Sequence, residues 1–326
     1  MLLHLLFCIF GFVILYFCAE WLVKGSSSFA RNMGITPIVI GLTVVAFGTS
    51  APELVVSLVS AIDGRSMMAV GNVIGSNICN IALVLGLSAV LQPIVCSRNV
   101  VKREIPIMMG ISLFLLFLFL NSKIGRIEGI ILFGGVVAYT IMNYQIAKNQ
   151  KEKKENDEAF NYAAELDEIG YVSSRGKQIL LILVGITGIT LGAKIIIYSA
   201  EIIMTAMGVS EKFISLTLLA FGTSLPELTT SVLAAIRKEM DISIGNLIGS
   251  NVFNILSVLG AVSIVRPITI PGGFINSGLV IDYIVMMFIS FIPWLMMRRD
   301  NTISRFNGAT LLICYAGYLV YLFMKM

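Results

Sequence analysis

Charged residues and histidine are scarce in this sequence. Only 13% of its 326 residues are Asp, Glu, Lys or Arg, whereas 57% are hydrophobic. That composition leaves too little polar surface to cover a water-soluble protein of this size. The single histidine, His4, excludes a histidine cluster that could hold a transition metal.

Motifs for several other kinds of chemistry are also missing. The five cysteines are odd in number, scattered and mostly within apolar segments, so they predict neither a disulfide framework nor a zinc site. The sequence has no nucleophile–base pair and no cofactor motif, so we expect neither an enzyme nor a bound cofactor. It has no basic stripe with interleaved aromatic residues, which argues against nucleic acid as a partner.

Long apolar segments recur along the chain, and each can cross a hydrocarbon core of about 30 Å. The first has no basic residue ahead of it and no small-residue cleavage pattern behind it, so we expect it to remain as a helix. The sequence predicts an all-α integral membrane protein of about ten transmembrane helices. Their expected ranges are 2–23, 36–61, 68–91, 104–121, 126–147, 178–205, 210–236, 242–265, 279–298 and 304–325.

One long polar segment of mixed charge, residues 148–177, divides the chain. We expect a first transmembrane repeat of five helices at 1–147 and a second, inverted one at 178–326. Most lysines and arginines of the expected loops fall on the same side of the membrane as the central segment. Positively charged loops stay inside, which predicts a multi-pass protein of the cell membrane with a cytoplasmic central segment and both termini outside.

Two motifs occur twice, at a constant offset of 174 positions. The segment 46–54, AFGTSAPEL, returns at 220–228 as AFGTSLPEL, and 71–81, GNVIGSNICNI, returns at 245–255 as GNLIGSNVFNI. The register holds without a gap over about sixty residues, which identifies an internal repeat. An odd number of helices per half makes the second copy enter the membrane from the opposite side, as in many secondary transporters.

Each copy of the first motif places a proline and a glutamate inside an apolar helix. Pro52 and Pro226 lack a backbone N–H, so we expect the helix to break there and to free carbonyls of the preceding turn, around 46–48 and 220–222. Thr49, Ser50 and Glu53 share one helix face with those carbonyls.

Amide and hydroxyl side chains follow on the next helix of each repeat. Asn72, Ser76 and Asn80 recur every four residues and return as 246, 250 and 254. If the halves fold together, Glu53 and Glu227 meet near the membrane midplane, where two carboxylates need a compensating ligand. Calcium takes six to eight oxygen ligands and balances two negative charges.

The paired motifs Gly-Thr-Ser-x-Pro-Glu and Gly-Asn-x-Ile-Gly-Ser-Asn resemble the two alpha-repeats of the calcium/cation antiporter superfamily, in its prokaryotic sodium/calcium exchanger branch. The resemblance covers residues of about 34–94 and 208–268. It implies exchange of several sodium ions for one calcium, with the first and sixth helices sliding across the rest. It also implies an ion site formed by the carbonyls of Ala46 and Ala220 and the side chains of Thr49, Ser50, Glu53, Ser76, Asn80, Thr223, Ser224, Glu227, Ser250 and Asn254.

One position departs from part of that superfamily. Some relatives, including potassium-dependent exchangers, carry aspartate where this chain has Asn254, so we expect exchange without potassium. A proton/calcium exchanger is the alternative, although such exchangers usually place their acid in a Gly-Asn-x-x-Glu pattern that is absent here. A passive cation channel is a further alternative. The expected partners are calcium and sodium ions and the lipid bilayer, without an obligatory protein partner.

Overall fold

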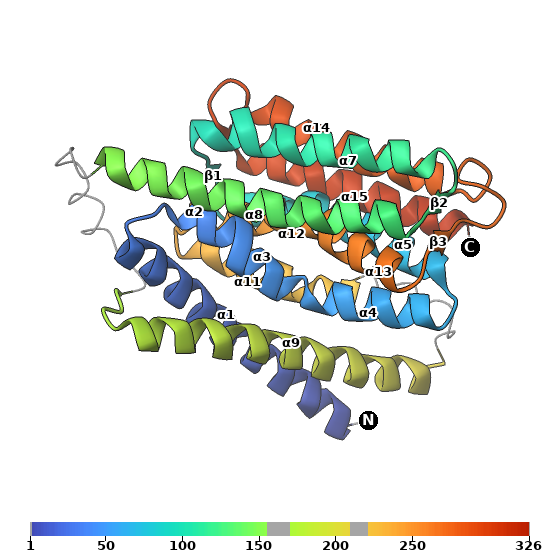
Figure 1. Cartoon of the computed structure of the whole chain (residues 1–326). Helices are drawn as coiled ribbons and strands as arrows, with labels where there is room; N and C mark the ends of the chain where they lie inside the picture. The colour runs from blue at the N-terminus through green and yellow to red at the C-terminus, as the bar shows by residue number, and fades with distance from the viewer. Residues whose placement is uncertain (1, 155–169, 209–220, 326) are drawn as a thin grey trace.

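The computed structural model describes residues 2–154, 170–208 and 221–325. Within these ranges the chain is almost entirely helical, and long helices run side by side along one direction (Figure 1). Seven described helices are individually long and apolar enough to cross a membrane, and a bent pair adds an eighth. With the shorter helical segments, the arrangement is a ten-helix membrane protein in two halves, as predicted.

The first half has five helical segments, of which the second is broken at Ser50 and the third runs on without a break through π-helical turns. They are α1 (Leu2–Met33); α2 (Pro37–Ile40), π-helical η1 (Gly41–Val45), α3 (Ala46–Thr49) and α4 (Ala51–Ile62); α5 (Ser66–Ile78), η2 (Cys79–Leu85) and α6 (Gly86–Leu91); η3 (Val100–Glu104) and α7 (Ile105–Phe119); and α8 (Arg126–Lys154).

The second half repeats this plan. Its segments are α9 (Arg175–Ala206); α11 (Leu225–Ile236); α12 (Met240–Phe253), η5 (Asn254–Leu259) and α13 (Gly260–Val265); α14 (Leu279–Met297); and α15 (Arg305–Lys325). The helix expected at 210–236 starts within 209–220, outside the described residues.

Two helices are longer than expected. α1 continues well past residue 23 to Met33, because its polar stretch is buried against α9: Gln178 Nε2 donates to the Ser28 carbonyl at 3.3 Å, and a Cβ on Gly25 would lie 2.9 Å from Leu181 Cβ. α8 continues past residue 147 to Lys154. Its last residues are mostly lysine, glutamate and glutamine, which favour helix in water.

Two short sheets show the inverted relation of the halves. β1 (Ile94–Val95) pairs with β4 (Thr302–Ile303), and β2 (Lys123–Ile124) pairs with β3 (Ile268–Thr269), both antiparallel. β1 and β3 are related by the 174-residue offset, yet the two sheets lie at opposite ends of the bundle (Figure 1). The second copy is therefore inverted with respect to the first.

Close contacts between helices at glycine residues are also repeated in the two halves. A Cβ on Gly86 would lie 3.1 Å from the Gly308 carbonyl oxygen, where α6 meets α15. A Cβ on Gly260 would lie 3.1 Å from the Gly129 carbonyl oxygen, where α13 meets α8. Each short helix thus packs on an outer helix at a contact that only glycine permits.

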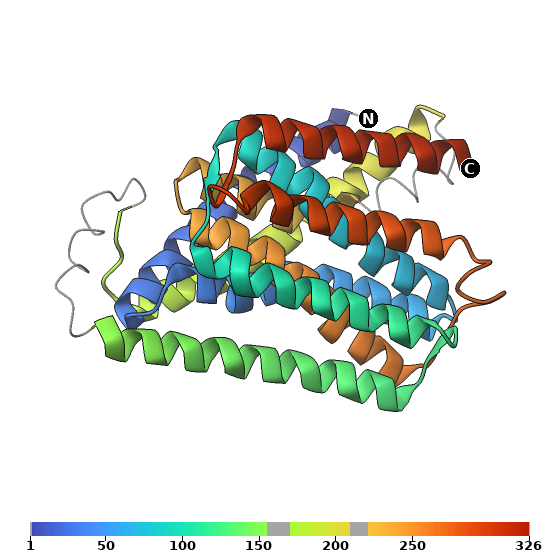
Figure 2. The ribbon, with the colours of Figure 1, turned by 90° about the horizontal axis from the view of Figure 1, so that it is seen from above.

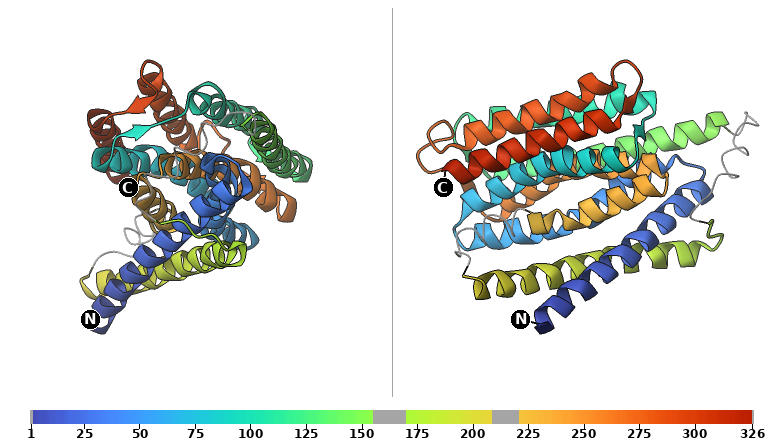
Figure 3. Two further views of the ribbon diagram at one scale, coloured as in Figure 1. Left: turned by 90° about the vertical axis from the view of Figure 1, so that its left-hand side faces the viewer. Right: turned by 180° about the vertical axis from the view of Figure 1, so that it is seen from behind.

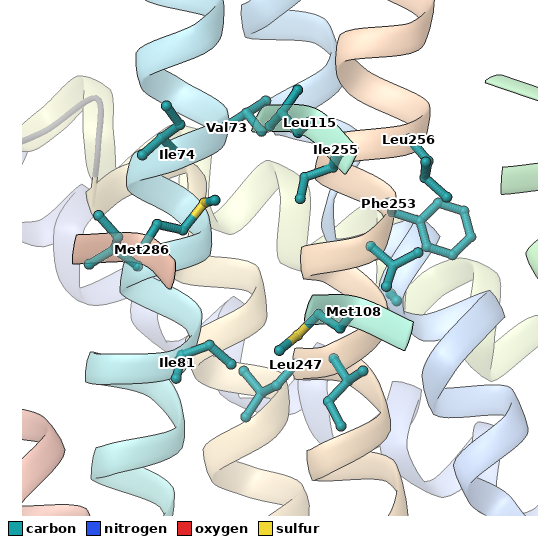
Figure 4. Close-up of a cluster of buried hydrophobic side chains, with 14 of the residues drawn as sticks. Val73, Ile74, Ile81, Met108, Leu115, Leu247, Phe253, Ile255, Leu256 and Met286 are labelled. Carbon is teal, nitrogen blue, oxygen red and sulfur yellow. The ribbon is translucent and has the colours of Figure 1, made fainter. Parts of the chain in front are cut away.

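Among the described residues the hydrophobic core has two parts. The larger surrounds α5 and α12, with Met108, Leu115 and Met286 from α7 and α14 against it (Figure 4). The smaller contains Leu15, Leu22 and neighbouring residues of α1 packed on α9. Viewed along the bundle, α1 and α9 form a separate layer beside the other helices (left panel of Figure 3), and the view from above shows the remaining helices running nearly parallel (Figure 2). The two termini lie toward the same end (Figure 1).

Candidate ion-binding site

Both repeats break their helix at a serine. α3 ends at Thr49 and α4 begins at Ala51, with a bend of 42° between Pro37–Thr49 and Ala51–Ile62. Ser50 and Ser224 have nearly the same backbone angles, φ −83° and ψ 5° against φ −87° and ψ 4°. Pro52 and Pro226 each follow two residues later in the first turn of the new helix, where a missing N–H is tolerated. The predicted breaks are confirmed.

The carbonyl of Ala46 is less free than the sequence suggested. It accepts the Ser50 N–H at 3.0 Å in an ordinary helical bond and lies 3.4 Å from Thr49 Oγ1. The N–H that Pro52 lacks would have bonded to the carbonyl of residue 48 and not to that of residue 46. The expectation of a freed carbonyl at 46 is therefore wrong, and an ion contact there would have to share the oxygen. Its role as a ligand stays a prediction. Ala220 lies outside the described residues.

Glu53 and Glu227 are completely buried. Each accepts a hydrogen bond from the serine of the other repeat: Ser50 Oγ lies 3.0 Å from Glu227 Oε1, and Ser224 Oγ lies 3.5 Å from Glu53 Oε1. The second oxygen of both carboxylates, Oε2, has no hydrogen-bond partner in the described part of the chain. Two carboxylates thus each keep one oxygen for a ligand.

A second pair of contacts also crosses between the repeats. Thr49 Oγ1 donates to Asn246 Oδ1 at 3.0 Å, and Thr223 Oγ1 donates to Asn72 Oδ1 at 3.4 Å. Ser250 Oγ lies 3.4 Å from Thr49 Oγ1. The contacts that α3 makes with α12 therefore return between α5 and the helical residues just before α11, as a two-fold axis requires.

Further along α5 and α12, and in η2 and η5 that follow them, asparagines of one repeat form hydrogen bonds with asparagines of the other. Asn80 Nδ2 donates to Asn251 Oδ1 at 3.1 Å, and Asn254 Nδ2 donates to Asn77 Oδ1 at 3.0 Å. The amide nitrogens are thus engaged, whereas the amide oxygens of Asn80 and Asn254 are buried without a partner among the described residues. This assignment of the amide atoms follows from the hydrogen-bond network.

Sequence reasoning missed Asn77 and Asn251 as part of the site. Both are buried, and both point at the opposite repeat through the contacts above. The signal was present, because both asparagines recur at the offset of 174 within the second motif. Neither lies in the stripe of polar residues spaced four apart at 72, 76 and 80, or in its repeat. A search along one helix face therefore does not find them.

Five of the buried oxygen atoms that have no partner among the described residues belong to the predicted site. They are Oε2 of Glu53 and Glu227, Oγ of Ser76, and Oδ1 of Asn80 and Asn254. Leaving a buried polar group unpaired costs about 1–3 kcal/mol, and for a carboxylate the cost is greater. In the described ranges no three or more His, Cys, Asp or Glu residues cluster as a metal group. Carboxylate, amide and hydroxyl oxygens suit hard cations such as calcium and sodium.

Comparisons with known proteins agree with this geometry. The profile of the family described as sodium/calcium exchanger protein matches residues 3–145 and 177–324. The chain is 36% identical over 326 residues to a putative antiporter, CaxA, of Alkalimonas amylolytica, covering 99% of both sequences. It is 33% identical over 328 residues to the inner membrane protein YrbG of Escherichia coli strain K12, covering 99% of this chain and 97% of YrbG.

A solved structure of the sodium-calcium exchanger NCX_Mj has the same fold. It superimposes with a TM-score of 0.82 at 29% sequence identity and covers 98% of each chain. The broken helices, the buried carboxylates and the inverted halves thus occur in a chain whose whole length matches known exchangers. This multi-pass membrane protein belongs to the sodium/calcium exchanger protein family and is a cation antiporter of the calcium-exchanging kind.

Proposed function

We propose that this protein exchanges sodium for calcium, with sodium rather than protons as the driving ion and without potassium. One observation carries the proposal: Glu53 and Glu227 are fully buried, have no cationic side chain in contact in the described residues, and each keep an unpartnered oxygen. A buried charge without a counter-charge is costly, so the two carboxylates require cations. One calcium ion supplies two charges.

Sodium ions compete for the same oxygens. The amide oxygens of Asn80 and Asn254 and the hydroxyls of the two helix breaks suit sodium as well as calcium. Calcium and several sodium ions would therefore bind in turn, and either load would compensate the negative charge of the two carboxylates. The carbonyls of Ala46 and Ala220 would complete the set.

The layered arrangement provides a route to alternating access. α1 and α9 form their own layer, with a hydrophobic cluster distinct from the main core. Sliding of this layer across the helix breaks would expose the site first to one side of the membrane and then to the other. The layer would slide only when one complete load, either calcium or sodium, fills the site, so that an empty site does not carry ions across.

Proton/calcium exchange is the second candidate, because carboxylates can bind protons. Calcium uptake into vesicles that contain the purified protein distinguishes proton/calcium from sodium/calcium exchange. Sodium, potassium and proton gradients are imposed one at a time. We expect uptake with an opposing sodium gradient alone. Uptake driven by the proton gradient alone would favour the alternative, and flux that needs no gradient of a second ion would favour a channel.

The orientation is also a proposal. The surplus of basic residues at one end predicts that the end of α8 is cytoplasmic and that both termini are outside. Lys148, which is exposed near the end of α8, can be replaced by cysteine in a cysteine-free background. A membrane-impermeant thiol reagent should not label Lys148→Cys in intact cells; labelling there would reverse the orientation.

A further inference from the structure

A basic pocket lies far from the helix breaks, where α14 ends and the segment leading into α7 begins. Its volume is about 490 Å³. Four cationic side chains line it together with Trp294, Asn301, Val101 and Pro106; the four are Arg98, Lys102, Arg298 and Arg299. The pocket is at the same end of the bundle as the C-terminal end of α8 (Figure 1).

The two basic segments are held together by a strand pair. β1 and β4 align Ile94 with Ile303 and Val95 with Thr302, and the Cys96 N–H donates to the Asn301 carbonyl at 2.8 Å. Arg98 lies two residues after this contact, and Arg299 lies two residues before it. The strand pair therefore holds the two segments that carry the cations next to each other.

The four cations have no acidic partner in the described ranges. Other basic residues at this end do: Arg31 pairs with Glu239, Arg103 with Glu104, and Arg237 with Glu20. Arg298 instead lies over the indole ring of Trp294, 5.4 Å from its centroid. Asp300 is in the same turn but does not line the pocket. Like charges gathered without a counter-ion repel one another, so the pocket calls for an anion.

The internal repeat supplies a comparison within the same molecule. At the opposite end, beside β2 and β3, Arg126 Nε donates to the Ile264 carbonyl at 3.2 Å and Arg266 donates to the Ile62 carbonyl. The positions that correspond to Arg98 and Lys102 by the 174-residue offset are Gly272 and Asn276. The cluster of unpaired cations is thus a property of one end and not a by-product of the repeat.

Apolar surface continues from the pocket along the two helices. Leu295 of α14 is 48% exposed, Phe288 of the same helix is 62% exposed, and Leu113 of α7 is 46% exposed. A small inorganic anion makes no use of such a surface, whereas the acyl chains of a phospholipid do. Trp294 lies at the boundary, where indole rings prefer the level of lipid headgroups.

We propose that this pocket binds the phosphate headgroup of an anionic phospholipid. The phosphate lies among Arg98, Lys102, Arg298 and Arg299, and the acyl chains extend along α7 and α14. Basic pockets between transmembrane helices on the cytoplasmic side are suited to such headgroups, and the loop charges predict that this end is cytoplasmic. The proposal does not depend on which ion drives exchange.

Native mass spectrometry of the purified protein in detergent tests the proposal, with phosphatidylglycerol and phosphatidylcholine added in equal amounts. We expect one phosphatidylglycerol to be retained with at least tenfold preference. The double variants Arg98→Gln/Lys102→Gln and Arg298→Gln/Arg299→Gln should each lower that preference at least tenfold. Arg298→Lys keeps the charge and should keep most of the binding.

A matched control removes two cations elsewhere. Arg65→Gln/Lys123→Gln lies at the other end, away from the pocket, and should change the preference less than twofold. The thermal unfolding temperature of every variant must lie within a few degrees of that of the parent, which shows that the fold is retained. Unchanged phosphatidylglycerol retention in both pocket variants would overturn the proposal, as would inorganic phosphate at millimolar concentration displacing the lipid completely.

Discussion

The hydroxyl of Ser50 lies 3.0 Å from Oε1 of Glu227, so the helix break of one repeat holds the carboxylate of the other. Ser224 and Glu53 repeat the contact in reverse at 3.5 Å. Each bond engages one carboxylate oxygen and leaves the second oxygen unpartnered among the described residues. The site is therefore a shared structure of both halves, and its two acids are equivalent in position.

Removing either charge should stop exchange. Glu53→Gln and Glu227→Gln each leave one negative charge, which cannot balance a calcium ion at low dielectric. The protein should still fold and gain slightly in stability, because a buried uncompensated carboxylate is lost. Sodium-driven calcium flux into vesicles measures the first effect, and thermal unfolding without calcium measures the second.

The control for these variants is Glu201→Gln, an exposed glutamate of α9. It makes the same chemical change outside the site and should leave flux near the parent rate. A variant at 53 or 227 that transports calcium as fast as the parent would remove that residue from the site.

Asn77 should act through Asn254. Asn77 Oδ1 accepts a hydrogen bond from Asn254 Nδ2 at 3.0 Å, which orients the amide and leaves its oxygen free to bind an ion. Asn77→Ala removes this acceptor, so the amide can rotate, and we expect calcium affinity to fall about fivefold to tenfold, as for one net hydrogen bond of roughly 1 kcal/mol.

A double-mutant cycle separates this positioning role from a general loss of stability. If Asn77 acts through Asn254, adding Asn77→Ala to Asn254→Ala should cost little more affinity than Asn254→Ala alone. Fully additive losses in calcium binding, measured by calorimetry, would mean that the two residues act independently.

Asn254 should set the choice of coupling ions. With asparagine here the site has two formal charges, which one calcium balances and three sodium ions exceed by one, so no potassium is needed. Asn254→Asp adds a third charge at low dielectric, which must take up a proton or recruit another cation. We expect potassium or pH sensitivity in this variant that the parent lacks.

The measurement for Asn254 is calcium flux against a fixed sodium gradient, with potassium replaced by choline on both sides. Asn254→Gln lengthens the side chain without adding charge and serves as the comparison. A parent protein that stops transporting in choline would contradict this explanation of the asparagine.

Ion pairs should hold α1 against the turn between α11 and α12. Arg31 lies 2.9 Å from Glu239 Oε1, which also accepts Ser27 Oγ at 2.7 Å, and Arg237 lies 2.5 Å from Glu20. Hydrogen bonds to charged groups contribute about 1.5–3 kcal/mol. Glu239→Gln should therefore make the last turns of α1 open at least tenfold more often.

Hydrogen–deuterium exchange of the amides in residues 24–33 tests this effect. Protection there should fall in Glu239→Gln, while protection in the first half of α1, whose contacts are with α9, should not change. Equal protection across α1 in the variant and the parent would show that the pair does not hold the helix.

The repeat made most of the fold predictable. An offset of 174 without gaps predicts two matching halves, and an odd number of helices in each predicts their inversion, which the two sheets at opposite ends confirm. The breaks before Pro52 and Pro226 were also predictable, because proline removes a specific hydrogen bond. The sequence placed the polar stripes that contain Thr49 and Asn246, but their pairing across the repeats came from the structure.

Other features depend on tertiary packing that leaves no local signal. The π-helical segments η2 and η5 begin at or next to Asn80 and Asn254, and they shift the helix register by contacts that a propensity scale does not contain. α1 continues through three consecutive serines because tertiary contacts cover them: Gln178 of α9 donates to the Ser28 carbonyl, and Ser27 donates to Glu239. The amide orientation of Asn80 depends on Asn251, which lies 171 positions further along the chain.

The cross-repeat contacts also have a consequence for the order of synthesis. Glu53 leaves the ribosome 174 residues before Glu227, and at about 5–20 residues per second that interval is roughly 10–35 s. During this time the first five helices hold a buried acid whose serine partner does not yet exist. The halves should therefore depend on each other for assembly in the membrane, and two separately encoded halves made in one cell should find each other through the bonds that complete the site.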